Sequence, residues 1–160
     1  MSGSGFGFCV WMLLASRSQW SRIAAKSRAR AGTGIPNVPL HVTMASDLST
    51  LEEAEEFAAK LPRSIPQLKV TGLPYTSTLI NSMWPEGFHA LEIPVRGHPD
   101  LPDGAHVSVA YRVGGVRFSR QDRVELCRER PFPPIEDVTI ALVDARDPDP
   151  ERWVKIIPDK

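Results

Sequence analysis

The sequence predicts a mainly β fold, a small antiparallel β-barrel or sandwich of about six to eight short strands with one N-terminal α-helix. Two observations support this prediction. After Pro62, apolar and polar residues alternate along several short runs, and 13 prolines from Pro62 to Pro158 lie mostly between those runs, where a missing amide donor does little harm. Helical periodicity is clear only in the segment just before these runs, and no helix–strand alternation indicates a parallel α/β fold.

The helix is predicted over about residues 50–61. It follows a capping pattern, in which the Ser49 hydroxyl can accept a hydrogen bond from the amide of Glu52. Apolar residues then recur at three- and four-residue spacing from Leu51 to Leu61. Pro62 ends the pattern, because proline cannot continue a helix.

The clearest strand signal lies at residues 105–113. Here Val107, Val109 and Tyr111 are expected on one face, with His106 and Ser108 on the other. Two glycines at positions 114 and 115 suit a tight turn, so the chain is predicted to return as a hairpin. The full set of expected strands lies at residues 68–70, 76–83, 88–95, 105–113, 116–119, 124–128, 138–143 and 153–157.

Charge divides the chain in two. The 19 basic and 19 acidic residues balance overall, but residues 1–46 contain no acidic residue and five basic ones, which leaves 14 basic and 19 acidic residues in 47–160. We therefore expect a basic leader or disordered extension at 1–46 and a single β-rich domain at 47–160. The leader has three interpretations: an over-long gene model, an organellar transit segment, or a membrane-associating helix.

Composition and motifs favour a binding function over catalysis. The chain lacks a phosphate-binding loop, a Gly-x-Ser-x-Gly elbow, a Cys-x-x-Cys pair and a His-Glu-x-x-His zinc motif, and no cofactor is implied. It also lacks the apolar run of about 20 residues that a transmembrane helix needs. Because residues 47–160 are net acidic, nucleic acid is not the partner we expect.

A group of arginines is the main candidate for a binding surface. In the predicted hairpin Arg112 opposes Arg117, and two like charges at such a position suggest that an anion lies between them. The sequence thus predicts a non-enzymatic module that binds a phosphorylated small ligand or an acidic protein partner; the alternative is a solvated face whose arginines pair with nearby glutamates. The candidate binding residues are Arg112, Arg117, Arg120, Arg123 and Arg128.

Two other functions stay open from the sequence. A transit segment would deliver an organellar subunit of a larger complex; otherwise the protein is expected in the cytoplasm. A metal-dependent enzyme would use a histidine–aspartate cluster, since imidazole and carboxylate suit zinc or iron. Its candidate ligands are His89, His98, His106 and Asp100, but residues 97–104 are interpreted more simply as two consecutive turns.

Overall fold

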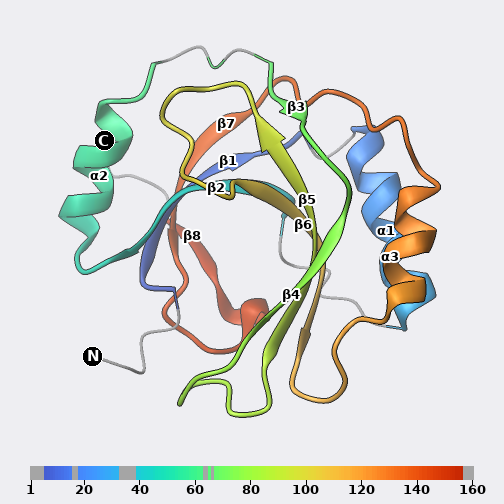
Figure 1. The fold of residues 1–160 in the computed structure, drawn as a ribbon. Coiled ribbons are helices and arrows are strands. Elements are labelled where there is room, and N and C mark those ends of the chain that lie inside the picture. Colours follow the sequence, from blue (N-terminus) through green and yellow to red (C-terminus); the bar gives the residue numbers. More distant parts are fainter. Residues whose placement is uncertain (1–5, 16–17, 33–38, 63–64, 66, 157–160) are drawn as a thin grey trace.

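Eight strands form one curved antiparallel sheet (Figure 1). The computed structural model describes residues 6–15, 18–32, 39–62, 65 and 67–156. The strand order is β3-β5-β6-β2-β1-β7-β8, and β4 pairs with the edge of β5 that also carries β3. The prediction of a mainly β fold is confirmed, and across the described residues the sheet is not closed. The strands are β1 Phe8–Leu13, β2 His41–Leu48, β3 Lys69–Val70, β4 Tyr75–Leu79, β5 Phe88–Arg96, β6 His106–Val113, β7 Thr139–Asp144 and β8 Val154–Ile156.

Strand β1 lies in the middle of the sheet. Its sequence Phe-Cys-Val-Trp-Met-Leu is apolar on both faces, as expected of a strand covered on both sides. It pairs with β2 on one edge and with β7 on the other. This placement differs from the division of the chain at residue 46, because the described part of residues 1–46 contributes a central strand to the sheet. Targeting to an organelle and assembly into a larger complex stay predictions.

Helix α1 (Gln19–Ala31) covers the convex face of the sheet. Trp20, Ile23 and Ala24 recur at helical spacing and are buried in the core, and Gly32 ends the helix in the left-handed conformation that suits glycine. The interpretation of this segment as a membrane-associating helix is therefore wrong, because its apolar face already packs against the sheet. No helix in the described part of the chain is long and apolar enough to cross a membrane.

Helix α2 (Leu51–Ala59) confirms the predicted helix, but its cap is one residue later than expected. Thr50, rather than Ser49, accepts the hydrogen bond, from the amide of Glu53. Helix α3 (Arg120–Cys127) replaces the strand predicted at 124–128. A reciprocal capping box between Ser119 and Asp122 begins this helix. A short 3₁₀ helix, Pro150–Arg152, precedes β8.

The two faces of the sheet carry two separate apolar clusters. On the convex face, Val42, Val107 and Leu91 pack with residues of the three helices. On the concave face, Cys9, Trp11 and other residues of β1, β5, β6 and β7 form a second, mostly aromatic cluster. Successive residues of a strand point to opposite faces, so each central strand serves both clusters.

Strand β6 departs from the predicted alternation at a β-bulge. Its register with β5 pairs Leu91 with Ala110 and Glu92 with Ser108, so one extra residue, Val109, lies on β6. The bulge brings Tyr111 to the same face as Ser108, whereas alternation had placed these side chains on opposite faces. A bulge shifts the side-chain pattern by one, which is why the simple alternation failed here.

Candidate functional site

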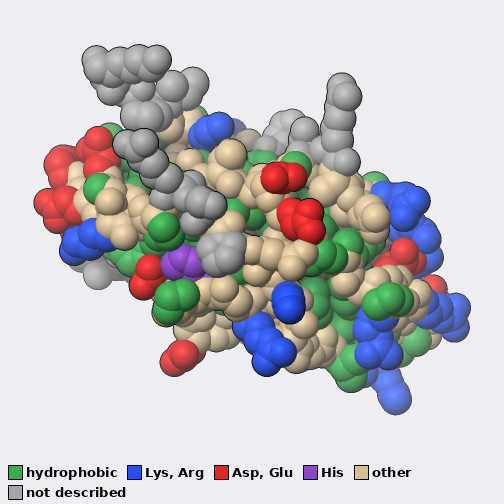
Figure 2. Space-filling view, turned by 90° about the horizontal axis from the view of Figure 1, so that it is seen from above, with side chains coloured by type: hydrophobic (Ala, Val, Ile, Leu, Met, Phe, Trp, Pro, Cys, Tyr) green, Lys and Arg blue, Asp and Glu red, His purple; other side chains and the backbone are tan. Residues whose placement is uncertain are grey.

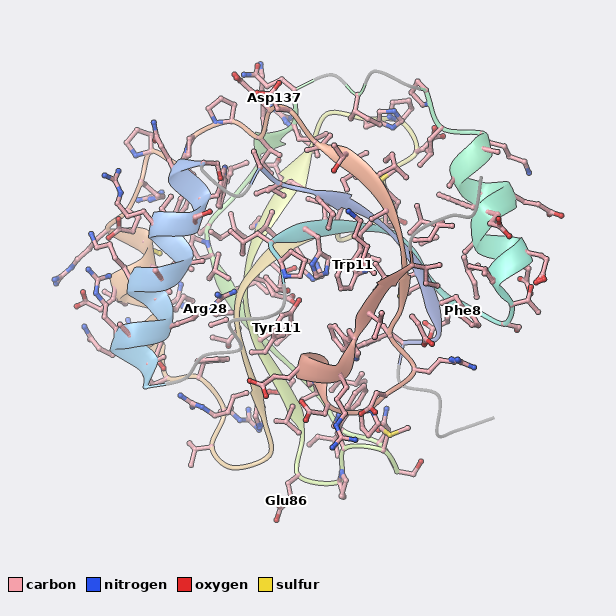
Figure 3. The ribbon with its side chains drawn as sticks, turned by 180° about the vertical axis from the view of Figure 1, so that it is seen from behind. Phe8, Trp11, Arg28, Glu86, Tyr111 and Asp137 are labelled. Atoms are coloured by element: carbon pink, nitrogen blue, oxygen red, sulfur yellow. The ribbon has the colours of Figure 1, made fainter. Side chains whose placement is uncertain are left out.

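A cavity of about 340 Å³ opens on the concave face of the sheet. Its polar lining comes mainly from three neighbouring strands, β2, β5 and β6, with Ser77 and Thr78 of β4 beside them. Its aromatic lining comes from β1, β5, β6 and the segments before β1 and β8. Figure 3 shows Trp11 and Tyr111 on this inner side of the curved sheet. The polar side chains that line the cavity and enter the argument below are His41, Thr43, Glu92, His106, Ser108 and Tyr111.

Two histidines occupy equivalent positions on paired strands. Val42 of β2 pairs with Val107 of β6 in antiparallel register, which places His41 opposite Ser108 and His106 opposite Thr43. The two valines are buried in the convex core, so the four polar side chains share the concave face. The result is an approximately two-fold arrangement in which each strand contributes one imidazole and one hydroxyl group.

Both histidine rings are oriented in the same way. Nδ1 of His41 lies 2.8 Å from the carbonyl oxygen of Pro39, and Nδ1 of His106 lies 2.8 Å from that of Gly104. A carbonyl oxygen only accepts, so each Nδ1 carries a proton and donates it to the residue two positions earlier. The Nε2 atom of each ring takes no part in this hydrogen bond, so it is available to accept or donate a proton elsewhere.

The His41 ring is buried and neutral. The Trp11 indole stacks on it, with ring centroids 3.4 Å apart and planes 4° from parallel. Burial lowers the pKa of His41 to about 4, and the nearby His106 adds to this effect. Because the proton of the neutral ring is on Nδ1, Nε2 carries a lone pair at neutral pH and can act as a base.

The His106 ring meets a carboxylate instead. Nε2 of His106 lies 2.9 Å from Oε2 of Glu92, so with Gly104 at Nδ1 both ring nitrogens face acceptors and both carry protons. Burial lowers the pKa of His106, but the hydrogen bond and charge of Glu92 outweigh burial and raise it overall. The raised pKa favours the protonated ring of His106, which can act as an acid.

The hydroxyl groups near Glu92 stay protonated. Ser108 Oγ donates to Oε2 of Glu92 at 3.3 Å. Burial and the charge of Glu92 raise the pKa of Tyr75 to about 12, and burial also raises the pKa of Tyr111 well above its usual value. These groups are therefore neutral hydrogen-bond donors at physiological pH.

Aromatic side chains form the apolar wall of the cavity. The ring of Phe88 lies 5.3 Å from that of Tyr111 and 6.1 Å from that of Trp153, and Phe6 lies 5.4 Å from Phe88. The indole of Trp153 donates a hydrogen bond to the carbonyl oxygen of Asp147. This bond holds the Trp153 ring in the wall of the cavity, just before β8. A ligand in the cavity thus meets polar groups on one side and aromatic rings on the other.

The structure separates the arginines that the sequence grouped together. Residues 116–119 lead into α3 and form no strand, so the predicted hairpin pairing of Arg112 with Arg117 is wrong. Arg112 donates to the carbonyl oxygens of Ala31 and Val116 and lies over the Phe118 ring, so its role is structural. Arg117 lies just before α3, Arg120 and Arg123 lie on it, and Arg128 follows its last residue and pairs with Glu125.

The candidate metal ligands are not brought together as a set: only His98 and Asp100 are neighbours, with Nδ1 of His98 3.8 Å from Oδ2 of Asp100. His89 points to the convex side and contacts Thr78 Oγ1 through Nδ1, His98 Nδ1 accepts from the amide of Asp100 in a turn, and His106 lies in the cavity. Within the described ranges no group of three or more His, Cys, Asp or Glu side chains is arranged to hold a metal ion.

The sequence contained a signal for the site that our prediction missed. The tripeptides His41-Val-Thr43 and His106-Val-Ser108 repeat the same pattern 65 residues apart, each at the start of a strand. In a strand, residues two apart share a face, so this repeat alone indicates two equivalent pairs of histidine and hydroxyl. Glu92 and Trp11 carry no comparable signal.

No family model and no curated protein sequence matches this chain. The geometry of the cavity is therefore the basis on which a function is assigned.

Proposed function

We propose that this protein is an acid–base enzyme that cleaves phosphodiesters, with His41 as the general base and His106 as the general acid. One observation carries the proposal: two imidazoles line one cavity from paired strands, in environments that shift their pKa values in opposite directions. A pair of titratable groups whose environments push their pKa values apart is the usual arrangement for acid–base catalysis. The adjacent Thr43 and Ser108 supply hydroxyl donors for phosphate oxygens.

The two-fold arrangement suits displacement at phosphorus. In such a reaction the attacking and leaving oxygens are in line on opposite sides of the phosphorus atom, and each needs a proton transfer. Nε2 of His41 takes the proton of the attacking water or hydroxyl as the new O–P bond forms. The Nε2 proton of His106 passes from its hydrogen bond with Glu92 to the oxygen whose P–O bond breaks, and exchange with solvent restores both rings.

Other hydrolytic mechanisms fit the cavity less well. Glycosidases use two carboxyl groups, whereas Glu92 is the one carboxylate among the described residues that line this cavity. A serine nucleophile needs a hydrogen bond to its base, but Ser108 donates to Glu92. Burial raises the pKa of Cys9 to about 12, which keeps that thiol protonated and unreactive.

The proposal is tested by replacing each histidine with glutamine. We expect His41→Gln and His106→Gln each to lower the rate of hydrolysis of bis(4-nitrophenyl) phosphate by about 100-fold or more, since general acid–base groups contribute on this scale. His98→Gln is the matched control, because His98 lies in a turn outside the cavity. Full activity in both cavity variants, with normal folding, would show that the histidines are not the catalytic pair.

A second candidate function is binding of an anionic partner at the end of the molecule that carries α1 and α3. Figure 2 shows Lys and Arg side chains gathered over this end and acidic side chains over the opposite one. Arg117 and Arg120 are exposed there, as is Arg22 of α1. This candidate does not compete with catalysis, because none of these arginines lines the cavity.

A further inference from the structure

Glu92 occupies the part of the cavity in which an anionic ligand would bind. It is 8% exposed, and its Oε2 atom lies 2.9 Å from Nε2 of His106 and 3.3 Å from Oγ of Ser108. These two donors are the ones that a phosphate oxygen would use. A bound phosphate must therefore take hydrogen bonds that the carboxylate holds in the unliganded protein.

The charges around Glu92 nearly cancel. The groups that face it are Tyr75 of β4 and His106, Ser108 and Tyr111 of β6. Of these only His106 carries a positive charge, when both of its ring nitrogens, which face acceptors, are protonated. His41 of β2, which also lines the cavity, has a lowered pKa and is neutral. No lysine or arginine occurs among the described residues that line the cavity.

One further cation lies close to this group but does not enter the cavity. The guanidinium of Arg28 acts on Tyr111 and donates from Nε to the carbonyl oxygen of Val109. Figure 3 shows Arg28 reaching from α1 toward the sheet, and Arg28 is not among the residues that line the cavity. The formal charge of the cavity, with His106 protonated and Glu92 ionised, is therefore zero.

We propose that Glu92 is a specificity-determining residue, whose charge admits singly charged phosphodiesters and disfavours doubly charged phosphomonoesters. The inference rests on the proposed function and names the substrate class of the same site. A diester adds one negative charge to a cavity whose formal charge is zero. A monoester carries close to two at neutral pH, because its second pKa is about 6, and the extra charge faces a carboxylate in a partly buried site. Cleavage of a diester by water yields a monoester, so the same repulsion favours release of the product.

Binding of two simple probes tests this inference. Dissociation constants of diphenyl phosphate and phenyl phosphate are measured at pH 7 by NMR titration of the native protein and of Glu92→Gln. We expect the native protein to bind the diester about tenfold more tightly than the monoester, and the variant to lose most of this difference through tighter monoester binding. Glu86→Gln is the matched control, since Glu86 is exposed in the loop after β4, outside the cavity.

A second measurement distinguishes an effect of the charge of Glu92 from an effect of the substitution on the structure of the site. The pKa of His106, followed by its ring proton resonances, should fall in Glu92→Gln and stay near the native value in Glu92→Asp, which keeps the charge. In the native protein alone, the ratio of monoester to diester affinity should rise as pH falls below 6, where the monoester loses its second charge. This measurement keeps the inference testable even if the glutamine variant does not fold.

The outcomes distinguish the two proposals. Equal binding of both probes by the native protein, with no change in Glu92→Gln, overturns the role of Glu92 and leaves phosphodiester cleavage standing. Selective binding of the diester without any hydrolysis of bis(4-nitrophenyl) phosphate supports charge selection by Glu92 and overturns the catalytic proposal. Binding of neither probe overturns both.

Discussion

At the scale of single residues, the environment of Nε2 separates two histidines that share the same backbone setting. Both donate from Nδ1 to a carbonyl two residues earlier, and both begin a strand. Trp11 covers the ring of His41 and excludes water, whereas Glu92 supplies a negative charge to His106. Two tripeptides of the same pattern therefore give a base on one strand and an acid on the next.

The buried neutral ring of His41 makes stability depend on pH. Its pKa in the folded protein is about 4, below the value of about 6.5 in an unfolded chain. Between these values only the unfolded chain binds the proton, so the free energy of unfolding falls as pH falls. We expect this residue to contribute a loss of about 2 kcal/mol between pH 7 and pH 5.

Urea denaturation of the native protein and of His41→Asn at both pH values measures this contribution. The loss of stability on acidification should be about 2 kcal/mol smaller in the variant, because asparagine does not titrate. His106 has the opposite sign, since its raised pKa adds stability that is lost as pH rises above about 6.5. Identical pH dependence in the two proteins would contradict a buried, neutral His41.

Part of the candidate site could be predicted from the sequence at this scale. The repeated tripeptides at His41 and His106 place two imidazoles and two hydroxyls on strand faces, and the period of a strand suffices for that. The contacts of Glu92 and Trp11 could not be predicted, because they depend on which strands become neighbours. Strand neighbours are set by packing of the whole sheet, which local patterns do not encode.

At the scale of elements, β1 decides whether the sheet forms. It supplies both edges on which β2 and β7 pair, and its side chains enter both apolar clusters. We expect a protein that begins at Met44 to be unfolded, because the deletion removes β1, α1 and the first three residues of β2. The loss of so much buried apolar surface exceeds the usual stability of a domain.

Circular dichroism and the dispersion of amide NMR resonances test this expectation. Deletion of residues 1–5, which precede the described chain, is the control and should leave both spectra unchanged. A Met44 protein with native dispersion and an unchanged melting temperature would show that the sheet does not need β1.

In two elements the prediction from the local sequence pattern was wrong. Val124 to Arg128 can be taken as a strand, but the capping box of Ser119 and Asp122 begins a helix there. In β6, the bulge at Val109 reverses the alternation and places Tyr111 in the cavity. The first error comes from a cap outside the segment considered, and the second from a register shift that depends on the partner strand.

At the scale of the whole molecule, charge is separated between two ends. The acidic side chains of α2 lie at one end, and the arginines of α1 and α3 at the other (Figure 2). The neutral total of the sequence conceals this separation. Some of the basic charge is balanced locally, since Lys26 and Arg30 pair with Glu129. The arginines at and before the start of α3 are the exposed remainder that an anionic partner would meet.

The triple variant Arg117→Ser, Arg120→Ser, Arg123→Ser tests whether this end binds anions. We expect weaker retention on heparin and elution at lower salt than for the native protein, because each lost cation reduces a screened electrostatic attraction. The control removes three exposed cations from α2, β3 and β5 at Lys60, Lys69 and Arg96, and so has the same net charge. Arg112 is kept, since its bonds to Ala31 and Val116 hold α1 and the loop after β6 together. If both variants elute at the same salt concentration, net charge alone governs retention and the arginines of α3 form no binding surface.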